Sequence, residues 1–531
     1  MPEGRGVAKW TGQIMGPVTR RFDHNIQTSH TAAFGGYANH LVSNALRLDS
    51  LSRRRRTAAT ALVVLILSYC ISAKPTTASK KAFSTPRFVI LKLLLRRCAN
   101  MVGSWLGLAS IRFTHAPTPL VLRTKDGEKK SLVEVCKAST PPCRLNPFLF
   151  NGHLQTMWTA VATEGPHIYY RRKIFDADHE TYFGSFAVDF AVPPHKDVDD
   201  TLPPRTAHYS DEDFAALGSD DSRPMLIVLH GLSGGSYELY LREAIAPLLA
   251  EGSDWDVVVV ISRGCAKSPI TSGVLFNARA TWDVRQVVKW CRKTYPNRPL
   301  FGLGFSLGAN ILTNYVGEEG ANCLLSGAIA VGSPFNLDVS NKALKRSTLG
   351  LHVYQRVMGS NVKRLVAEHK ESLEAHSKLD FERIANVNYL YEFDRAVQCP
   401  CWGYPTEDAY YRDSSSSDAI LGIRIPFLAI SATDDPIAVD EAVPYEEFKQ
   451  NPFTVHCTTS LGGHLSWFEL GGGRWHKRPI ENFLRTLASD IDLNFSRSVS
   501  DKAIEPKPPG THGFDPLRRR MIVKQVKVEE D

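Results

Sequence analysis

The chain has 531 residues, of which 43% are hydrophobic, so it is long and apolar enough for one large domain with extensions. Its net charge of +8 is unevenly spread, because residues 1–100 hold 16 Lys and Arg against 3 Asp and Glu. The other 431 residues therefore carry −5, which is +8 less the +13 of the first hundred. A mildly acidic body lacks the charge that neutralises phosphates, which excludes nucleic-acid binding by that body.

The N-terminal segment, residues 1–100, combines basic clusters with apolar stretches. Arg53–Arg56 precedes Thr57–Ala73, an uncharged run of about 17 residues, the lower limit for a membrane-spanning helix. The arginines place the N-terminus on the cytoplasmic side of such a span, and the run lies too far along the chain for a cleaved signal peptide. Phe88–Arg97 is short, apolar and basic, as in segments that lie in the interface of an anionic membrane. We therefore predict a membrane-associated leader, with a single-pass span as one alternative.

Two other interpretations of this segment stay open. It is either a disordered basic leader or an amphipathic targeting peptide, with the body at a cytoplasmic, lipid-droplet or endoplasmic-reticulum surface. The ten cysteines show no paired C-x-x-C spacing, and Cys399-Pro400-Cys401 is a single close pair, so we expect no structural zinc site. A chain of this length needs no disulfides, which favours reduced thiols facing the cytosol and conflicts with a span that exports the body. No cofactor is indicated.

The sequence pattern changes near Ser104. We predict a folded body over residues 101–490 and a C-terminal tail over residues 491–531. Residues 111–122 alternate in places like a strand, residues 125–128 form a turn, and short strands follow at 168–170 and 186–190. Continuous apolar runs then alternate with helical patterns such as 280–290. Such runs are typical of parallel strands covered on both faces, so the fold class is α/β with a mostly parallel central sheet. The runs are 225–229, 255–261, 299–305, 326–332, 425–431 and 453–458.

Residues 335–420 interrupt this alternation with charged helical patterns and the aromatic loop Trp402–Pro405. An insertion at this point lies where a lid over an acyl pocket is expected. The alternative is a solvated helical excursion.

The run at 299–305 leads into Gly304-Phe305-Ser306-Leu307-Gly308 and at once into a helical pattern. This G-x-S-x-G at a strand-to-helix turn is the nucleophile elbow of the α/β-hydrolases. The turn must be tight and strained to expose the serine, and a Cβ two positions to either side would collide with neighbouring backbone. Helix N–H groups beside Ser306 are suited to an oxyanion. The motif predicts Ser306 as a nucleophile.

A serine hydroxyl needs a base and an orienting acid, which follow it in this chain order in the α/β-hydrolases. Among the histidines after Ser306, His464 alone sits in a glycine turn just after the final predicted strand. Asp435 follows the strand that ends at Ser431 and is the preferred acid, with Asp434 as the alternative. All three residues follow the ends of predicted strands, so their side chains fall at the same edge of the sheet. The oxyanion N–H groups are assigned to Leu307 and, after His230-Gly231, to Leu232.

Between about Ser104 and Trp475 the chain resembles one branch of the α/β-hydrolases. This branch includes bacterial YheT-like hydrolases, mammalian membrane-associated hydrolases of the ABHD type and fungal medium-chain fatty-acid ethyl ester synthase/esterases. The fungal group is the most similar of the three, especially over Ala278–Arg285 and Leu461–Glu469. The stretches that carry the resemblance are Asn146–Thr156, His230–Ser236, Ser262–Cys265, Gly304–Asn310, Asp434–Pro436 and Gly462–Leu465. Met101–Leu108 is similar to a usual N-terminus of these proteins, so residues 1–100 are interpreted as an added leader or the product of an upstream start.

The resemblance implies hydrolysis of medium-chain fatty-acyl esters and acyl transfer from acyl-CoA to an alcohol. Some relatives have a His-x4-Asp acyltransferase signature, and Glu469 stands at that position here, which weakens the transferase assignment. Nothing in the serine, aspartate and histidine decides between water and an alcohol as the acceptor. The alternatives are a monoacylglycerol lipase or phospholipase and, from a different class, a catalytically silent lipid-binding protein on a membrane.

Overall fold

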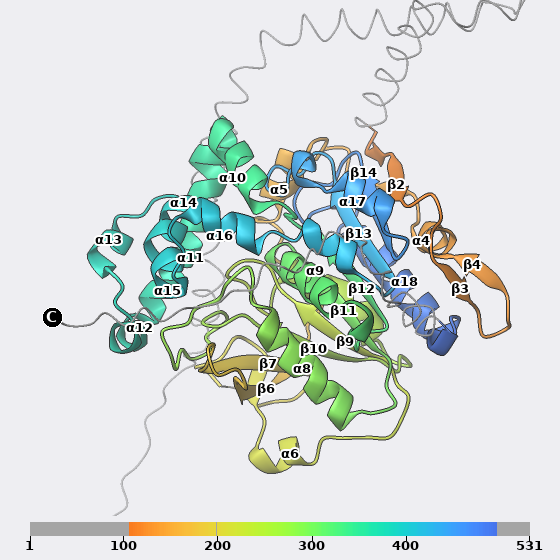
Figure 1. Ribbon diagram of the computed structural model, residues 1–531, viewed down its shortest axis with the longest axis horizontal. Helices are drawn as coiled ribbons and strands as arrows, with labels where there is room; N and C mark the ends of the chain where they lie inside the picture. Colours follow the sequence, from red (N-terminus) through yellow and green to blue (C-terminus); the bar gives the residue numbers. More distant parts are fainter. Residues whose placement is uncertain (1–105, 198, 496–531) are drawn as a thin grey trace, which may run out of the picture. The chain divides into compact units, whose positions relative to one another are not determined.

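A computed structural model describes residues 106–197 and 199–495 of the chain (Figure 1). The predictions made for residues 1–100, with Thr57–Ala73 and Phe88–Arg97, and for residues 496–531 fall outside these ranges. In the described ranges, no helix has the length and apolarity that a membrane crossing requires. Residues 106–159 and 163–495 belong to one compact unit.

The centre of this unit is a ten-stranded sheet. Its six middle strands, from β14 to β10, pair in parallel, and antiparallel pairs join β2 at one side and β7 at the other. The mostly parallel sheet predicted from the apolar runs is confirmed. The strands, in sheet order, are β2 (Ile111–His115), β14 (Thr454–Thr459), β13 (Phe427–Ala432), β12 (Gly327–Val331), β11 (Leu300–Phe305), β9 (Met225–Leu229), β10 (Asp256–Ile261), β7 (Ser185–Val192), β6 (Tyr169–Asp176) and β8 (Thr206–His208).

Helices cover both faces of this sheet, which is why its middle strands are continuous apolar runs. Every residue of β9, β11, β12, β13 and β14 is buried. Helices α8 (Thr281–Thr294) and α9 (Leu307–Glu319) pack against each other, and α18 (Lys477–Ser489) packs against α4 (Leu132–Ser139) and α7 (Leu239–Ile245) (Figure 1). The smaller elements are β1 (Leu108–Ala109), β3 (Val121–Arg123), β4 (Lys129–Ser131), β5 (Cys143–Arg144), α5 (Gly152–Trp158), α6 (Asp211–Ala215) and α17 (Tyr445–Gln450).

The segment between β12 and β13 is almost entirely helical, as its sequence predicted (Figure 1). It begins with α10 (Leu337–Arg346) and continues through a short π-helix at Gly350–Gln355. The remaining helices are α11 (Arg356–Glu368), α12 (Lys370–His376), α13 (Phe381–Ala385), α14 (Leu390–Phe393), α15 (Cys399–Trp402) and α16 (Glu407–Ser414), with a second π-helical segment at Asp394–Gln398. We call this segment the helical insertion.

Two details refine the expected boundaries. The stretch 111–122 forms two strands in different sheets, β2 and β3, rather than one. At the other end, Ile491 is buried and bridges to Thr124, and Asp492 donates its N–H to Arg123 O at 2.8 Å. The packed body therefore continues past α18. The eight cysteines among the described residues are free thiols, and Cys401 alone of them is not buried.

Candidate active site

Ser306 occupies the turn between β11 and α9 with φ 52° and ψ −116°, a strained backbone conformation for a residue with a side chain. The two glycines of the motif explain how the turn closes. A Cβ on Gly304 would lie 2.6 Å from the Ala309 Cα, and a Cβ on Gly308 would lie 2.5 Å from the carbonyl oxygens of Leu229 and His230. The steric reason given for the glycines from the sequence alone is confirmed.

The structure brings the three sequence-predicted side chains into one hydrogen-bonded chain. The Oγ of Ser306 lies 2.9 Å from Nε2 of His464, and Nδ1 of the same imidazole lies 2.8 Å from Oδ2 of Asp435. The side chain of Asp435 is fully buried, and its Oδ1 accepts the N–H groups of Ile437 and Ala438 at 2.8 and 2.9 Å. These two bonds orient the carboxylate, so that the imidazole stands between the Ser306 hydroxyl and a carboxylate that is held in place.

Asp434, the alternative acid, does not contact His464. Its Oδ1 accepts the N–H of Gly463 at 3.0 Å, which ties the turn after β13 to the loop that carries the histidine. Burial, helped by the neighbouring Asp435 charge, raises the pKa of Asp434 to about 6. The two adjacent aspartates thus face different partners, and Asp435 alone of the pair reaches the imidazole.

The residues assigned to the oxyanion site flank Ser306. Leu307 is the first residue of α9, so its N–H has no partner within the helix. On the other side, a Cβ on Gly231 would lie 3.5 Å from the Ser306 Cβ, which places the His230-Gly231-Leu232 turn beside the nucleophile. In the part of the chain that the structure describes, the N–H groups of Leu307 and Leu232 donate no hydrogen bond. Both donors are therefore available to a ligand.

His230 holds this turn in place. Its Nε2 accepts the N–H of Ser262 at 3.1 Å, so Nδ1 carries the ring proton and donates it to the carbonyl of Gly231 at 2.7 Å. Burial lowers the pKa of His230 to about 4, which keeps the ring neutral and the tautomer fixed. The N–H of Gly231 is held in turn by the Tyr240 hydroxyl at 2.8 Å.

Helix α5 is the part of the site whose role sequence reasoning missed. Thr156 Oγ1 accepts the N–H of His464 at 2.9 Å and donates to the carbonyl of Gly152 at 2.7 Å. A Cβ on Gly152 would overlap the Asp434 carbonyl, and one on Gly463 would lie 2.6 Å from the Gly152 carbonyl. Helix α5 thus lies against both loops that carry the acid and the base. The stretch 146–156 was one of those that carry the family resemblance, but nothing in the sequence indicated that Thr156 contacts His464.

The helical insertion reaches the neighbourhood of Ser306. Leu307, which follows the nucleophile, packs with Leu337 and Tyr404 around a cluster of Ala278, Tyr410 and Tyr411. The end of α16 is tied to α9, because Asn310 donates to the Ser414 carbonyl at 2.8 Å and Asn314 donates to the same oxygen at 3.0 Å. The insertion therefore packs against Leu307, the elbow residue that follows the nucleophile.

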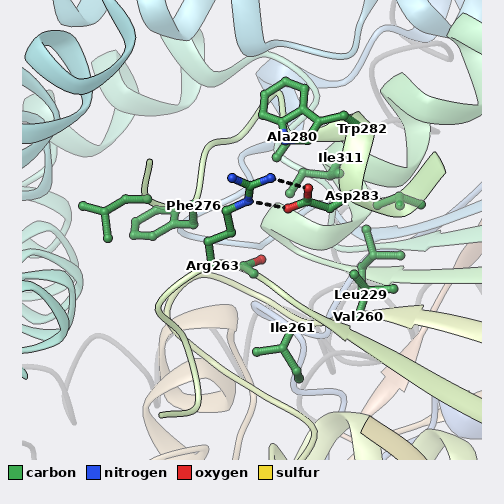
Figure 2. A pocket seen from close by; sticks show the side chains of 12 residues that line it. Leu229, Val260, Ile261, Arg263, Phe276, Ala280, Trp282, Asp283 and Ile311 are labelled. Carbon is green, nitrogen blue, oxygen red and sulfur yellow. Dashed lines mark hydrogen bonds and ion pairs between the residues drawn. The ribbon is translucent and has the colours of Figure 1, made fainter. Parts of the chain in front are cut away.

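A small cavity lies between the strand ends and α8 and α9 (Figure 2). Leu229, Val260 and Ile311 contribute to its apolar wall, and the buried ion pair of Arg263 and Asp283 crosses it at 2.7 and 2.9 Å. The cavity has a volume of about 20 Å³, room for one water molecule but not for an acyl chain. A fatty-acyl group therefore needs a different or a wider space.

Comparisons with known proteins agree with this geometry. A family model described as the alpha/beta hydrolase fold matches residues 224–469. The chain is 37% identical over 385 residues to the monoacylglycerol lipase of Saccharomyces cerevisiae, an alignment that covers 68% of this chain and 84% of the relative. It is 29% identical over 384 residues to the medium-chain fatty acid ethyl ester synthase/esterase 2 of the same yeast, covering 64% and 84%. With mouse phospholipase ABHD3 it shares 28% identity over 257 residues, covering 48% and 61%.

The chain belongs to the α/β-hydrolase fold family, within its ABHD-type branch and near the fungal esterases. The resemblance drawn from the motifs is thus confirmed. The relatives are named as a lipase, an ester synthase/esterase and a phospholipase, which supports a carboxylic ester hydrolase.

Proposed function

We propose that the protein is a serine hydrolase of fatty-acyl esters, in which Ser306 is the nucleophile, His464 the general base and Asp435 the residue that orients the imidazole. The observation that carries the proposal is the continuous chain of hydrogen bonds from Ser306 Oγ through both ring nitrogens of His464 to Asp435. A hydroxyl is a weak nucleophile, and this arrangement removes its proton as it attacks.

The reaction follows from the position of each group. Ser306 Oγ attacks the ester carbonyl carbon while His464 Nε2 takes the hydroxyl proton. The N–H groups of Leu307 and Leu232 stabilise the oxyanion, and removal of one such donor costs about 2.7–4 kcal/mol of barrier stabilisation. Collapse breaks the ester C–O bond, and the leaving alkoxide takes the proton from His464. Water, deprotonated by His464, then attacks the acyl carbonyl carbon. The bond to Ser306 Oγ breaks, His464 returns the proton to Oγ, and the fatty acid leaves.

An alcohol in place of water would turn the second half of the reaction into acyl transfer. This second candidate function is favoured by the similarity to the yeast ethyl ester synthase/esterase. Glu469, at the position of the acyltransferase aspartate, is bound to Arg478 at 2.5 Å, so its carboxylate already has a partner. We therefore propose hydrolysis as the main activity, on medium-chain esters, with monoacylglycerols or phospholipids as the alternative substrates.

The helical insertion is proposed as a lid over the acyl site. Its support is the packing of Tyr404, Tyr410 and Leu337 around Leu307, the residue that follows the nucleophile. Entry of an acyl chain would require these aromatic side chains to move apart.

The test begins with fluorophosphonate labelling of the wild type, Ser306→Ala and a control, Ser431→Ala, whose serine is buried at the end of β13. We expect labelling to vanish in Ser306→Ala alone. Hydrolysis of p-nitrophenyl esters of increasing acyl length, with and without ethanol, then measures chain preference and transfer. Equal labelling of wild type and Ser306→Ala would overturn the assignment, and no labelling of any of the three would favour the silent lipid-binding protein.

A further inference from the structure

Exposed apolar side chains gather on the segments around α5. The described residues include nine exposed large hydrophobic side chains, and six of them lie at 106–108, 148–158 and 470. Single exposed apolar residues are ordinary on a protein surface, but a group of them marks a contact surface. We define the apolar face by four of these residues, with their exposed fractions: Leu108 (48%), Phe148 (79%), Trp158 (43%) and Leu470 (68%).

Hydrogen bonds show that these segments are neighbours although they are far apart in sequence. Leu145 donates its N–H to the Gly107 carbonyl at 2.7 Å, and Asn146 donates to the Phe468 carbonyl at 2.8 Å. Phe468 in turn donates its N–H to the side chain of Gln155, within α5, at 2.8 Å. The segments that carry the apolar face are therefore neighbours in the fold, although they are far apart in the sequence.

Some of the same segments contact the loop that carries His464. Thr156 of α5 bonds the backbone of His464, and Thr159 bonds Ser466 at 3.0 Å through their hydroxyls. Leu470 stands six residues after His464, at a loop whose Gly471, Gly472 and Gly473 all have positive φ. A contact made by the apolar face is thus made beside the loop that carries the proposed base.

The charge of the chain indicates which surface the apolar face meets. Residues 1–100 carry a net +13, and the described fold begins at Leu106, two residues before Leu108. The strand pairing sets Leu108 opposite Arg144, which is exposed. Exposed apolar and aromatic side chains, preceded in the sequence by a strongly basic segment, match the interface of a membrane with anionic headgroups.

We propose that the apolar face docks on an anionic lipid surface and presents the active site to ester substrates held there. This inference rests on the proposed function for its substrate. Leu470 and Phe148 enter the acyl-chain boundary, Trp158 lies at the headgroup level, and the basic N-terminal segment supplies the long-range attraction. Substrate then passes from the lipid to Ser306 without crossing bulk water.

The experiment uses the full chain and two matched double variants. Phe148→Ser/Leu470→Ser changes the apolar face, and Val121→Ser/Phe183→Ser removes two exposed apolar side chains elsewhere, 45% and 60% exposed. Co-flotation with phosphatidylcholine vesicles, with and without phosphatidylserine, measures partitioning. Hydrolysis of a monoacylglycerol within the vesicles and of a soluble short-chain p-nitrophenyl ester measures the two activities.

We expect the face variant to partition into vesicles at least about tenfold less than the wild type. It lacks two apolar side chains that the wild type would bury in the lipid. Its vesicle-bound hydrolysis should fall in step, while its soluble-ester hydrolysis and both properties of the control variant stay unchanged. Equal partitioning of face variant and wild type would overturn the proposal and indicate that the N-terminal segment or a second copy covers this face. An equal loss in the control variant would overturn it too. A wild type inactive on the soluble ester would refute the proposed function, whereas partitioning tests the face independently.

Discussion

At the scale of single residues, the adjacent aspartates after β13 show how environment separates two like side chains. The Asp435 carboxylate accepts two backbone N–H groups besides its contact with His464. Asp434 accepts the N–H of Gly463 in a buried position, and its pKa is raised to about 6. The pair therefore divides into a carboxyl group that faces the imidazole and one that joins two loops.

This division predicts unequal effects of the same substitution. Asp435→Asn should lower kcat by about 10⁴-fold, because an amide at this position favours the wrong imidazole tautomer. Asp434→Asn keeps an oxygen for the Gly463 N–H and should change kcat less than about tenfold, the effect of one weakened hydrogen bond. Steady-state kinetics on a p-nitrophenyl ester compare the two variants. A larger loss in Asp434→Asn would reverse the proposed roles.

At the scale of elements, α5 connects parts of the site that the chain keeps far apart. Its Thr156 bonds the backbone of His464, and its Gly152 packs against the carbonyl of Asp434. On another side of the helix, His153 Nδ1 lies 2.8 Å from the hydroxyl of Tyr354, in the helical insertion. Burial lowers the pKa of His153. One short helix therefore contacts the acid loop, the base loop and the insertion.

We predict that Thr156 positions His464. Thr156→Val has nearly the same volume but leaves the His464 N–H without its acceptor, whereas Thr156→Ser keeps the hydroxyl. An unsatisfied buried donor costs about 1–3 kcal/mol, so kcat should fall by about 5- to 150-fold in the valine variant with KM little changed. The serine variant should recover most of this loss. If both variants lose activity equally, or if KM rises while kcat is kept, Thr156 has only a structural role.

At the scale of the whole molecule, buried titratable groups act in opposite directions on stability. Burial raises the pKa of Glu238 and of Asp394 to about 7, and it lowers the pKa of His230 to about 4 and of His456 to about 3. Between about pH 4 and 7 the folded state keeps protons on the two acids that the unfolded chain releases, so the free energy of unfolding falls as pH rises. The histidines do the reverse, because the unfolded chain binds protons that the folded state excludes.

A substitution in the helical insertion isolates one of these contributions. Asp394 is buried and accepts the hydroxyl of Tyr411 at 2.5 Å, with the Glu407 charge nearby. Asp394→Asn keeps an acceptor and cannot ionise, so its stability relative to the wild type should increase by up to a few kcal/mol as pH rises from about 4 to 7. Urea unfolding of both proteins at pH 5 and pH 8 measures the difference. A difference that is independent of pH would show that Asp394 ionises in the folded state as it does in the unfolded chain.

Local sequence patterns were sufficient to predict the central sheet and the nucleophile elbow. The apolar runs predicted the strands β9 to β13 because a parallel strand buried on both faces is mostly apolar. The run at 453–458 predicted β14 as well, although this buried strand also contains threonines and His456. The turn at Ser306 was readable because glycines at 304 and 308 are required wherever backbone approaches this closely. The order of serine, acid and histidine along the chain then indicated which side chains meet at one edge of the sheet.

The sequence alone thus determined the fold class, the elbow, and the serine and histidine proposed for catalysis, and it limited the acid to Asp435 or Asp434. Tertiary structure decided the contacts whose partners lie hundreds of residues apart. Whether Asp434 or Asp435 reaches His464 depends on how the turn after β13 closes, which two adjacent carboxylates do not reveal. The bond from Thr156 to His464 spans 308 positions, and the apolar face joins Leu108, Phe148 and Leu470. Neither has a local signature, because each exists only once the sheet has brought distant loops together.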